Sequence, residues 1–331
     1  MRGRAAGVIM ATVGALAVAA GLIVLLIVVP DRAQFPDDVA RMRYYEGDLA
    51  LMLNADALAS GDLANVFIRD VPITIDRSIE TLEVDGSKAL VFDGSVVSGP
   101  AGPILDSEDV YAIDRKTMES IANFTDDDRV IDRQGLVVGF PIGTDAEDYI
   151  GFNGDTLTTN TISYVGKEQH EGLDTYRFAA SSGPDPIADP DLLAMFPPAL
   201  PKAVIEGLIP ALDLPADAAA GLAEVLPALP DPIPLSYTYT YETNYWVEPD
   251  SGVLIDYDKL ESRTVAVSLG DQAVPVAEVM HLEYAQTDAS VADAVADAED
   301  ARSNLFWQGT VLPYALLAGG ALLMLAGLVF T

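Results

Sequence analysis

The chain has 331 residues, 50% of them hydrophobic, and its 51 acidic side chains against 18 basic ones give a formal net charge of −33. This excess of acid excludes nucleic acid and anionic lipid headgroups as direct partners, because both need positive charge on the protein. The absence of cysteine excludes disulfide bonds, thiol catalysis and thiolate metal sites.

Residues 1–30 are predicted to be an N-terminal transmembrane anchor. The run from Ala5 to Val29 carries no charge and would form a helix of about 37 Å, enough to cross a hydrocarbon core of about 30 Å. Arg2 and Arg4 precede the run, so the positive-inside rule places this end in the cytoplasm. A cleaved signal peptide is the alternative, but the apolar run is longer than the core of a typical signal peptide.

A stripe of small residues at four-residue spacing in this anchor predicts close packing against another apolar helix. The stripe consists of Gly7, Ala11, Ala15 and Ala19, and its expected partners in the second span are Ala315 and Gly319. No ionisable residue lies within either apolar run, which argues against an ion pathway or a proton relay there.

Residues 31–48 are predicted to be a linker, and residues 49–287 an extracytoplasmic β-rich domain. Alternating apolar residues in 71–82 and a second β-type run in 88–97, with Asp85-Gly86 between them, predict a β-hairpin. Further strands are expected at 109–113, 157–165, 175–179, 253–257, 261–269 and 274–284. Tyr237, Tyr239 and Tyr241 alternate with threonines in another strand, where they either stabilise the sheet or stack on a sugar or lipid.

A proline-rich insertion at 183–234 interrupts the strands. Short apolar helices are predicted within it at 191–196, 202–209 and 216–226. They form either a cap on one end of the β core or the mouth of an apolar ligand site, and the cap is favoured because apolar helices usually pack inward. The candidate ligand-binding residues for such a mouth are Leu193, Met195, Phe196, Ile205 and Leu208.

Residues 288–305 are predicted to form a stalk helix, and residues 306–331 a C-terminal transmembrane helix. Val291, Val295, Ala298 and Arg302 share one face of the stalk. The run 311–330 is uncharged and about 30 Å long as a helix, and the aromatic residues before and within it are typical of a membrane interface. Both termini are therefore expected in the cytoplasm, with the main domain outside the cell membrane.

The chemistry of the chain does not predict an enzyme, a metal or a cofactor. No nucleotide-binding, zinc-protease or serine-hydrolase motif occurs. His281 with Glu278 and Glu283 matches a set of zinc ligands only at chance level. His170 lies in a polar turn more than 100 residues before His281. Asp126-Asp127-Asp128 lacks the glycine and glutamate of a calcium loop, which favours a solvated turn.

The many acidic residues are spread along the chain and are not grouped at ligand spacing. A hydrated surface adapted to high salt is therefore favoured over a calcium-loaded one. In molar salt the Debye length is about 3 Å, so repulsion among these charges is screened.

Three stretches carry a family resemblance: AIDRKT at 112–117, GLVVGFPIGTDAEDY at 135–149 and ISYVGKEQHEGLDTYRF at 162–178. With the two spans, they resemble a family of two-span surface proteins of unknown function, also labelled the PorA porin family and best known from actinobacteria. The resemblance covers nearly the whole chain, although the proline-rich region and the strong acidity depart from it. It implies a surface domain between two spans, and the label implies a pore.

The topology is also similar, by analogy at the level of the fold only, to class B scavenger receptors. Those receptors hold a β-rich, tunnelled ectodomain with a helical cap between two spans. An outer-membrane barrel is not expected, because residues 49–285 are too acidic and irregular to form a lipid-facing apolar band.

The sequence therefore predicts an α+β, mostly β fold: an antiparallel β-rich ectodomain with a short-helix cap, held between N- and C-terminal transmembrane helices. The expected role is non-catalytic, namely binding or passing an apolar envelope or environmental molecule, with membrane lipid and an apolar small molecule as partners. One alternative is a structural module that links the membrane to a surface-layer protein. The other is an oligomeric pore.

Overall fold

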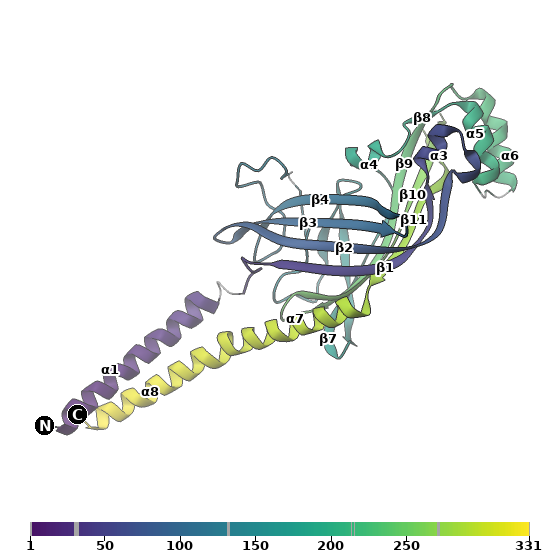
Figure 1. The fold of residues 1–331 in the computed structure, drawn as a ribbon. Coiled ribbons are helices and arrows are strands. Elements are labelled where there is room, and N and C mark those ends of the chain that lie inside the picture. Colours follow the sequence, from purple (N-terminus) through teal and green to yellow (C-terminus); the bar gives the residue numbers. More distant parts are fainter. Residues whose placement is uncertain are drawn as a thin grey trace.

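A computed structural model describes residues 2–29, 33–130, 133–212, 214, 216–269 and 272–330. Strand is its most abundant secondary structure, with helices at both ends of the chain and between the strands (Figure 1). The predicted class, mostly β with helical termini, is confirmed. The strands are β1 (Ala40–Leu53), β2 (Phe67–Asp85), β3 (Lys88–Gly99), β4 (Gly102–Asp114), β5 (Tyr149–Asn153), β6 (Thr158–His170), β7 (Leu173–Pro186), β8 (Ala199–Leu200), β9 (Ile233–Glu248), β10 (Val253–Leu269) and β11 (Gln272–Gln286).

The helices fall into three groups: a terminal pair, a set of short helices, and a long helix before the C-terminal one. They are α1 (Arg2–Ile23), α3 (Ala55–Ser60), α4 (Pro190–Ala194), α5 (Lys202–Leu208), α6 (Ala216–Val225), α7 (Asp288–Phe306) and α8 (Leu312–Phe330). Two π-helical segments, Val24–Val28 and Trp307–Val311, extend α1 and join α7 to α8. Three short 3-10 helices lie at Leu63–Asn65, Ile209–Ala211 and Leu226–Ala228.

The strands form one antiparallel sheet in the order β4-β3-β2-β1-β11-β10-β9-β7-β6-β5, with β8 beside β9. The hairpin predicted at Asp85-Gly86 is confirmed: β2 and β3 pair through Asp85 and Lys88, and Gly86 adopts φ 61°, which suits glycine at a tight turn. The turn at Glu171-Gly172 likewise joins β6 to β7.

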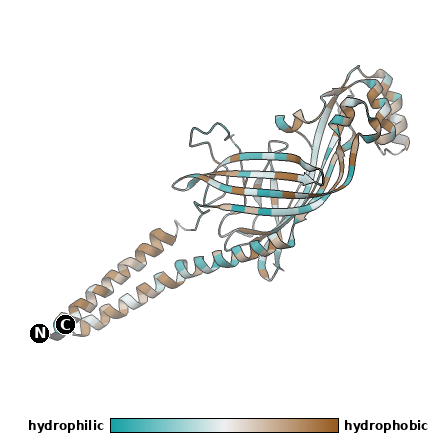
Figure 2. Cartoon of the chain, viewed as in Figure 1, coloured by the Kyte–Doolittle hydropathy of each residue, from teal (hydrophilic) through white to brown (hydrophobic). Residues whose placement is uncertain are grey.

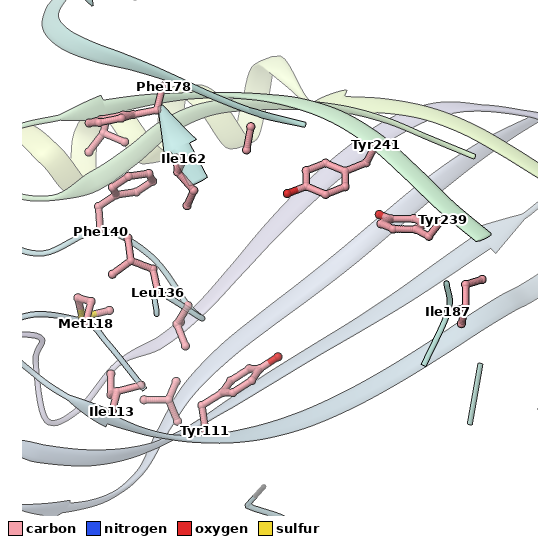
Figure 3. Close-up of a cluster of buried hydrophobic side chains, with 14 of the residues drawn as sticks. Tyr111, Ile113, Met118, Leu136, Phe140, Ile162, Phe178, Ile187, Tyr239 and Tyr241 are labelled. Carbon is pink, nitrogen blue, oxygen red and sulfur yellow. The ribbon is translucent and has the colours of Figure 1, made fainter. Parts of the chain in front are cut away.

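The sheet curls into a half-barrel, because strands from opposite parts of its order share one core. Val91 and Ile113 of β3 and β4 lie in the same buried cluster as Phe178 and Val247 of β7 and β9. The connection between β4 and β5 fills the space between them. Figure 3 shows Phe140 and Leu136 of this connection among side chains from both sets of strands, and Phe140 stacks on Phe178 at a centroid distance of 4.9 Å.

Helix α7 packs on the face of the sheet opposite the half-barrel core. Val291, Ala294 and Ala298 are buried against Val253 and Ile255 of β10. The Thr287 hydroxyl caps the helix by accepting a hydrogen bond from the Ser290 backbone N–H at 3.2 Å. Helix α7 corresponds in sequence to the predicted stalk at 288–305. Part of its length packs along the sheet.

Helices α1 and α8 pack side by side and antiparallel, so the two ends of the chain lie together (Figure 1). Figure 2 shows that this helical hairpin is hydrophobic over most of its length. The buried residues recur every seven positions: Gly7, Gly14 and Gly21 on α1, and Pro313, Gly320 and Gly327 on α8. A Cβ on Gly14 would lie 2.5 Å from the Gly320 carbonyl oxygen, so only glycine permits this approach.

The predicted four-residue stripe is therefore wrong beyond its first residues. Ala15 and Ala19 are exposed within the chain, as are their expected partners Ala315 and Gly319. The contacts follow heptad spacing because seven residues are close to two helical turns, so the same side of each helix faces its neighbour at all three contacts. A strict four-residue stripe instead winds around the helix.

The predicted linker 31–48 is also shorter than expected, because β1 begins at Ala40. Arg41 and Arg43 give this strand a linker-like composition, but both approach Asp297 of α7, at 3.5 Å and 2.6 Å. A partner more than 250 residues away in the sequence thus holds the strand. Met1, Pro30–Arg32 and Thr331, which belong to the predicted anchor, linker and second span, lie outside the described residues.

The proline-rich insertion contains α4, α5 and α6, close to the predicted helices. Helices α5 and α6 lie with α3 at the end of the molecule farthest from the chain termini (Figure 1). Ile205 of α5 is buried in a cluster with Leu226, Ile233 and Val267, so this helix packs inward on the ends of β9 and β10.

Candidate functional site

A cleft lies on the concave face of the half-barrel and has a volume of about 640 Å³. Strands β2, β3 and β4 line one side, and strands β9, β10 and β11 line the other. Residues 136–140 and 151–155 close it towards the apolar core, and residues around α4 lie at its margin. The curl of the sheet thus creates a cavity that no single strand could provide.

A row of charges on β10 crosses this cleft. Strand alternation places Tyr257, Lys259, Glu261 and Arg263 on one face of the sheet. Lys259 Nζ lies 2.7 Å from Glu261 Oε2, and Arg263 Nη1 lies 3.4 Å from Glu261 Oε1. Arg263 Nη2 also lies 2.6 Å from Asp155 Oδ2, which follows β5. The two positive and two negative charges cancel, which makes their burial tolerable.

The electrostatic balance of this row centres on Glu261. Burial alone would raise the pKa of its carboxyl, but Lys259 and Arg263 stabilise the ionised form and lower the pKa to about 2. Burial would lower the pKa of the Lys259 ammonium, yet Glu261 raises that pKa well above its usual range. Glu261 and Lys259 are therefore both charged at neutral pH.

A second ion pair, half-buried, crosses from β2 to β3. The Arg77 guanidinium donates two hydrogen bonds to Asp93, at 2.8 Å and 2.6 Å, in the bidentate geometry that favours an arginine–carboxylate pair. Three basic side chains line the cleft, namely Arg77, Lys259 and Arg263. Each of them forms an ion pair with a carboxylate.

Tyrosines make up much of the remaining lining. The Tyr239 hydroxyl donates to Glu261 at 2.6 Å, and the Tyr241 hydroxyl accepts from Asn160 Nδ2 at 3.1 Å. Tyr45 meets Tyr257 and Tyr284 edge to face, with centroids 5.8 Å and 5.9 Å apart. Of the predicted tyrosine row of β9, Tyr239 and Tyr241 line the cleft, whereas Tyr237 is buried in the half-barrel core.

The cleft is acidic as a whole. Its lining holds eight acidic side chains and three basic ones, which are paired as above. The acids are Asp93, Asp106, Glu108, Asp109, Asp155, Asp189, Asp191 and Glu261. Low-dielectric walls concentrate such a field, so the cleft repels anions and favours neutral or cationic solutes.

The five ligand-binding residues predicted from the sequence do not lie on one surface. Met195 lines the cleft and is 48% exposed. Leu193 and Phe196 are half-buried against the half-barrel core, where Phe196 stacks on Tyr237 at 4.7 Å. Ile205 and Leu208 are buried in α5, at the far end of the molecule. Of the five, only Met195 is part of the cleft lining.

Sequence reasoning missed the charged row of β10. Charges at every second position usually mark a solvent-facing side of a strand, so this pattern predicts a strand but not an inward-facing row. The available signal was the sequence Tyr257-x-Lys259-x-Glu261-x-Arg263, in which opposite charges alternate and a tyrosine shares the face. Such a face neutralises itself and can therefore point inward.

The two histidines lie outside this cleft. His170 Nε2 is 2.8 Å from Asp256, and its ring stacks on Trp246 at 4.8 Å. His281 Nδ1 is 2.9 Å from the Ser262 hydroxyl and 3.4 Å from Glu278. Each ring has hydrogen-bond partners of its own, and the two are not brought together.

Comparison with known proteins gives one family. A family model described as Porin PorA matches residues 6–329. A protein described as Porin PorA from Corynebacterium resistens is 27% identical over 230 residues, covering 60% of this chain and 55% of that protein. The alignment thus spans about half the length of that relative.

Similarity to solved structures is slight. A protein of unknown function with a hot dog fold from Alicyclobacillus acidocaldarius is 9% identical, with a TM-score of 0.13 over 80% of this chain and 84% of that one. An acyl-CoA thioesterase II from Mycobacterium marinum is 10% identical, with a TM-score of 0.12 over 75% and 79%.

Proposed function

Because the chain belongs to the Porin PorA family, we propose that it is a membrane-anchored, non-catalytic protein that binds or passes a small solute. The cleft on the concave face of the half-barrel is the surface that contacts this solute. The observation that carries the proposal is the cleft itself: about 640 Å³, lined by tyrosines and by buried ion pairs.

The α1–α8 hairpin supports membrane anchoring. Both terminal helices contain stretches long and apolar enough to cross a membrane, and they run antiparallel. Their exposed residues are large and hydrophobic, as lipid-facing residues are. With Arg2 and Arg4 at the start of α1, the positive-inside rule favours cytoplasmic termini and an extracytoplasmic half-barrel.

The lining of the cleft modifies the solute expected from the sequence. A wholly apolar molecule would cover the carboxylates and tyrosine hydroxyls without replacing their contacts with water, which is costly. An amphipathic solute, with one face for the tyrosine rings and polar groups for the acids, matches the lining better. The proposal is therefore an amphipathic solute in this cleft, with Met195 at its margin.

The test is native mass spectrometry of the full-length chain, extracted in detergent from its own membranes. We expect a small-molecule mass bound to the wild type and its loss in Ser107→Trp, since Ser107 is an exposed residue of the cleft lining. Ser303→Trp, on the exposed side of α7, is the matched control and should keep the bound mass. A solute retained equally by both variants would contradict the assignment of the cleft.

A second candidate is a pore, which the family description favours. The buried glycines at heptad spacing form a glycine seam (Gly7, Gly14, Gly21, Gly320 and Gly327). This seam brings α1 and α8 so close that one hairpin leaves no room between its helices for water. A pore through the membrane would therefore need several copies of the hairpin. Planar-bilayer recording on the purified full-length chain tests this: stepwise conductance supports the pore, and a silent bilayer with an intact solute-binding cleft supports the first candidate alone.

A further inference from the structure

We propose that the cleft takes a neutral carbohydrate, an inference that rests on the proposed function and deepens it. The cleft offers three features at once: an unused hydrogen-bond donor, carboxylates without a basic partner, and tyrosine rings. A sugar satisfies all three, because its hydroxyl groups accept and donate hydrogen bonds while its C–H faces lie against aromatic rings.

The unused donor is the side-chain amide of Asn153, at the end of β5. This residue lines the cleft and is only 8% exposed. Its Oδ1 accepts hydrogen bonds from the backbone N–H groups of Asp155 and Thr156, at 3.1 Å and 3.4 Å, which fixes the orientation of the amide. Its Nδ2 is buried and has no partner among the described residues. Buried amides are normally satisfied, so this donor points to an acceptor on a ligand.

The free acceptors are carboxylates at the margin of the cleft. Asp106 on β4 and Asp191 on α4 line it, and neither lies within ion-pair distance of a basic side chain in the described part of the chain. The described basic groups of the lining, in contrast, already have carboxylate partners. The cleft can thus accept hydrogen bonds from hydroxyl groups but offers no unpaired cation to an anionic ligand.

Aromatic rings supply the third feature. Tyr245, Tyr257 and Tyr284 line the cleft and are half-buried, so part of each ring remains accessible. The rings of Tyr245 and Tyr257 have centroids 5.2 Å apart and planes tilted by 60°, so two aromatic rings lie together in the lining. A lipid chain would use this surface too, but it would leave the Asn153 donor and both carboxylates without partners.

The experiment uses the full-length chain in nanodiscs and a pool of neutral mono- to tetrasaccharides, monitored by saturation-transfer difference NMR. We expect saturation transfer to at least one neutral member and none to glucuronate, which carries a charge of the wrong sign for this cleft. The strongest neutral binder is then titrated against two variants. Asn153→Asp keeps the acceptor oxygen that holds the turn but removes the donor, and it should raise the Kd at least tenfold.

The matched control is Asn65→Asp, at an exposed asparagine outside the cleft, which should leave the Kd unchanged. Absence of saturation transfer from every saccharide overturns the carbohydrate assignment, as does a Kd that is equal in Asn153→Asp and the wild type. If native mass spectrometry still finds a solute that Ser107→Trp removes, the cleft function stands and only the solute class is wrong. If neither experiment finds a ligand, the proposed function fails as well.

Discussion

Glu261 is the side chain on which the charges of the cleft depend, because it contacts Lys259, Arg263 and the Tyr239 hydroxyl at once. A buried ion pair adds little stability relative to a well-packed apolar pair, since both charges lose their hydration. Removing one member is different, because it leaves an uncompensated charge in a medium of low dielectric constant. Breaking the row is therefore expected to destabilise the fold strongly, whereas the intact row adds little to its stability.

Glu261→Gln should lower the free energy of unfolding by about 3 kcal/mol, because Lys259 and Arg263 would then face only Asp155. Urea unfolding of the full-length chain in detergent measures this loss. Glu83→Gln, at an exposed position on β2, is the control and should change stability by about 0.5 kcal/mol or less. Equal effects of the two substitutions would show that the row is hydrated.

The same residue makes stability depend on pH. The pKa of Glu261 is about 2 in the fold against a reference value of 4.5, so its ionised form stabilises the folded state above about pH 4.5. This contribution is lost as the pH falls through about 2. The stability difference between the wild type and Glu261→Gln should therefore be constant near neutrality and shrink below about pH 4.5. Unfolding measured at several pH values checks this, and a difference that grows in acid would contradict it.

At the scale of the element, the α1–α8 hairpin depends on glycines at heptad spacing. Gly320→Leu should separate the helices, because a Cβ there would lie 2.6 Å from the Gly14 carbonyl oxygen. Gly319→Leu, one residue away, is the matched control, because a Cβ at Gly319 would have no atom within 4 Å. Spin labels on cysteines introduced at Arg4 and Phe330 report the separation. A longer distance in Gly320→Leu alone is expected, and unchanged distances in both would disprove the seam.

Helix α7 offers a similar contrast on the sheet. Ala294 is fully buried against β10, so Ala294→Leu should destabilise the domain by about 1–3 kcal/mol through overpacking. Ala296→Leu lies on the exposed side of the same helix and should be nearly neutral. Thermal unfolding followed by circular dichroism measures both. If Ala294→Leu unfolds like the control, α7 does not pack tightly on the sheet.

Local patterns in the sequence were sufficient for most elements but not for their assembly. The Asp85-Gly86 turn, the tyrosine strand and the short helices between prolines depend on neighbours in the chain, and they appear where predicted. The start of β1 was missed because Asp297 holds its arginines from the far end of the sequence. The cleft was missed for the same reason, since Asp155 and Arg263 meet only after the sheet has curled.

At the scale of the whole molecule, the net charge of −33 should make stability depend on salt. Repulsion among the acidic side chains weakens as the Debye length falls from about 10 Å in 0.1 M salt to about 3 Å in 1 M salt. We expect the Tm of the full-length chain to rise over this range of sodium chloride. Sucrose, which leaves the charges unscreened, serves as the control for preferential hydration. A Tm that is independent of sodium chloride would show that the acids are well separated in the fold.

The continuous helical stretch from Asp288 to Phe330, which includes the π-helical segment Trp307–Val311, has a geometric consequence. Its 43 residues span roughly 64 Å and join the buried face of α7 on the sheet to the glycine seam of the hairpin. Each residue turns a helix by about 100°, so the number of residues between Ala298 and Gly320 sets the direction in which the cleft opens around the long axis of the α1–α8 hairpin. One inserted residue would rotate the cleft mouth by about a quarter turn, whereas seven inserted residues would bring it to within about 20° of its original direction.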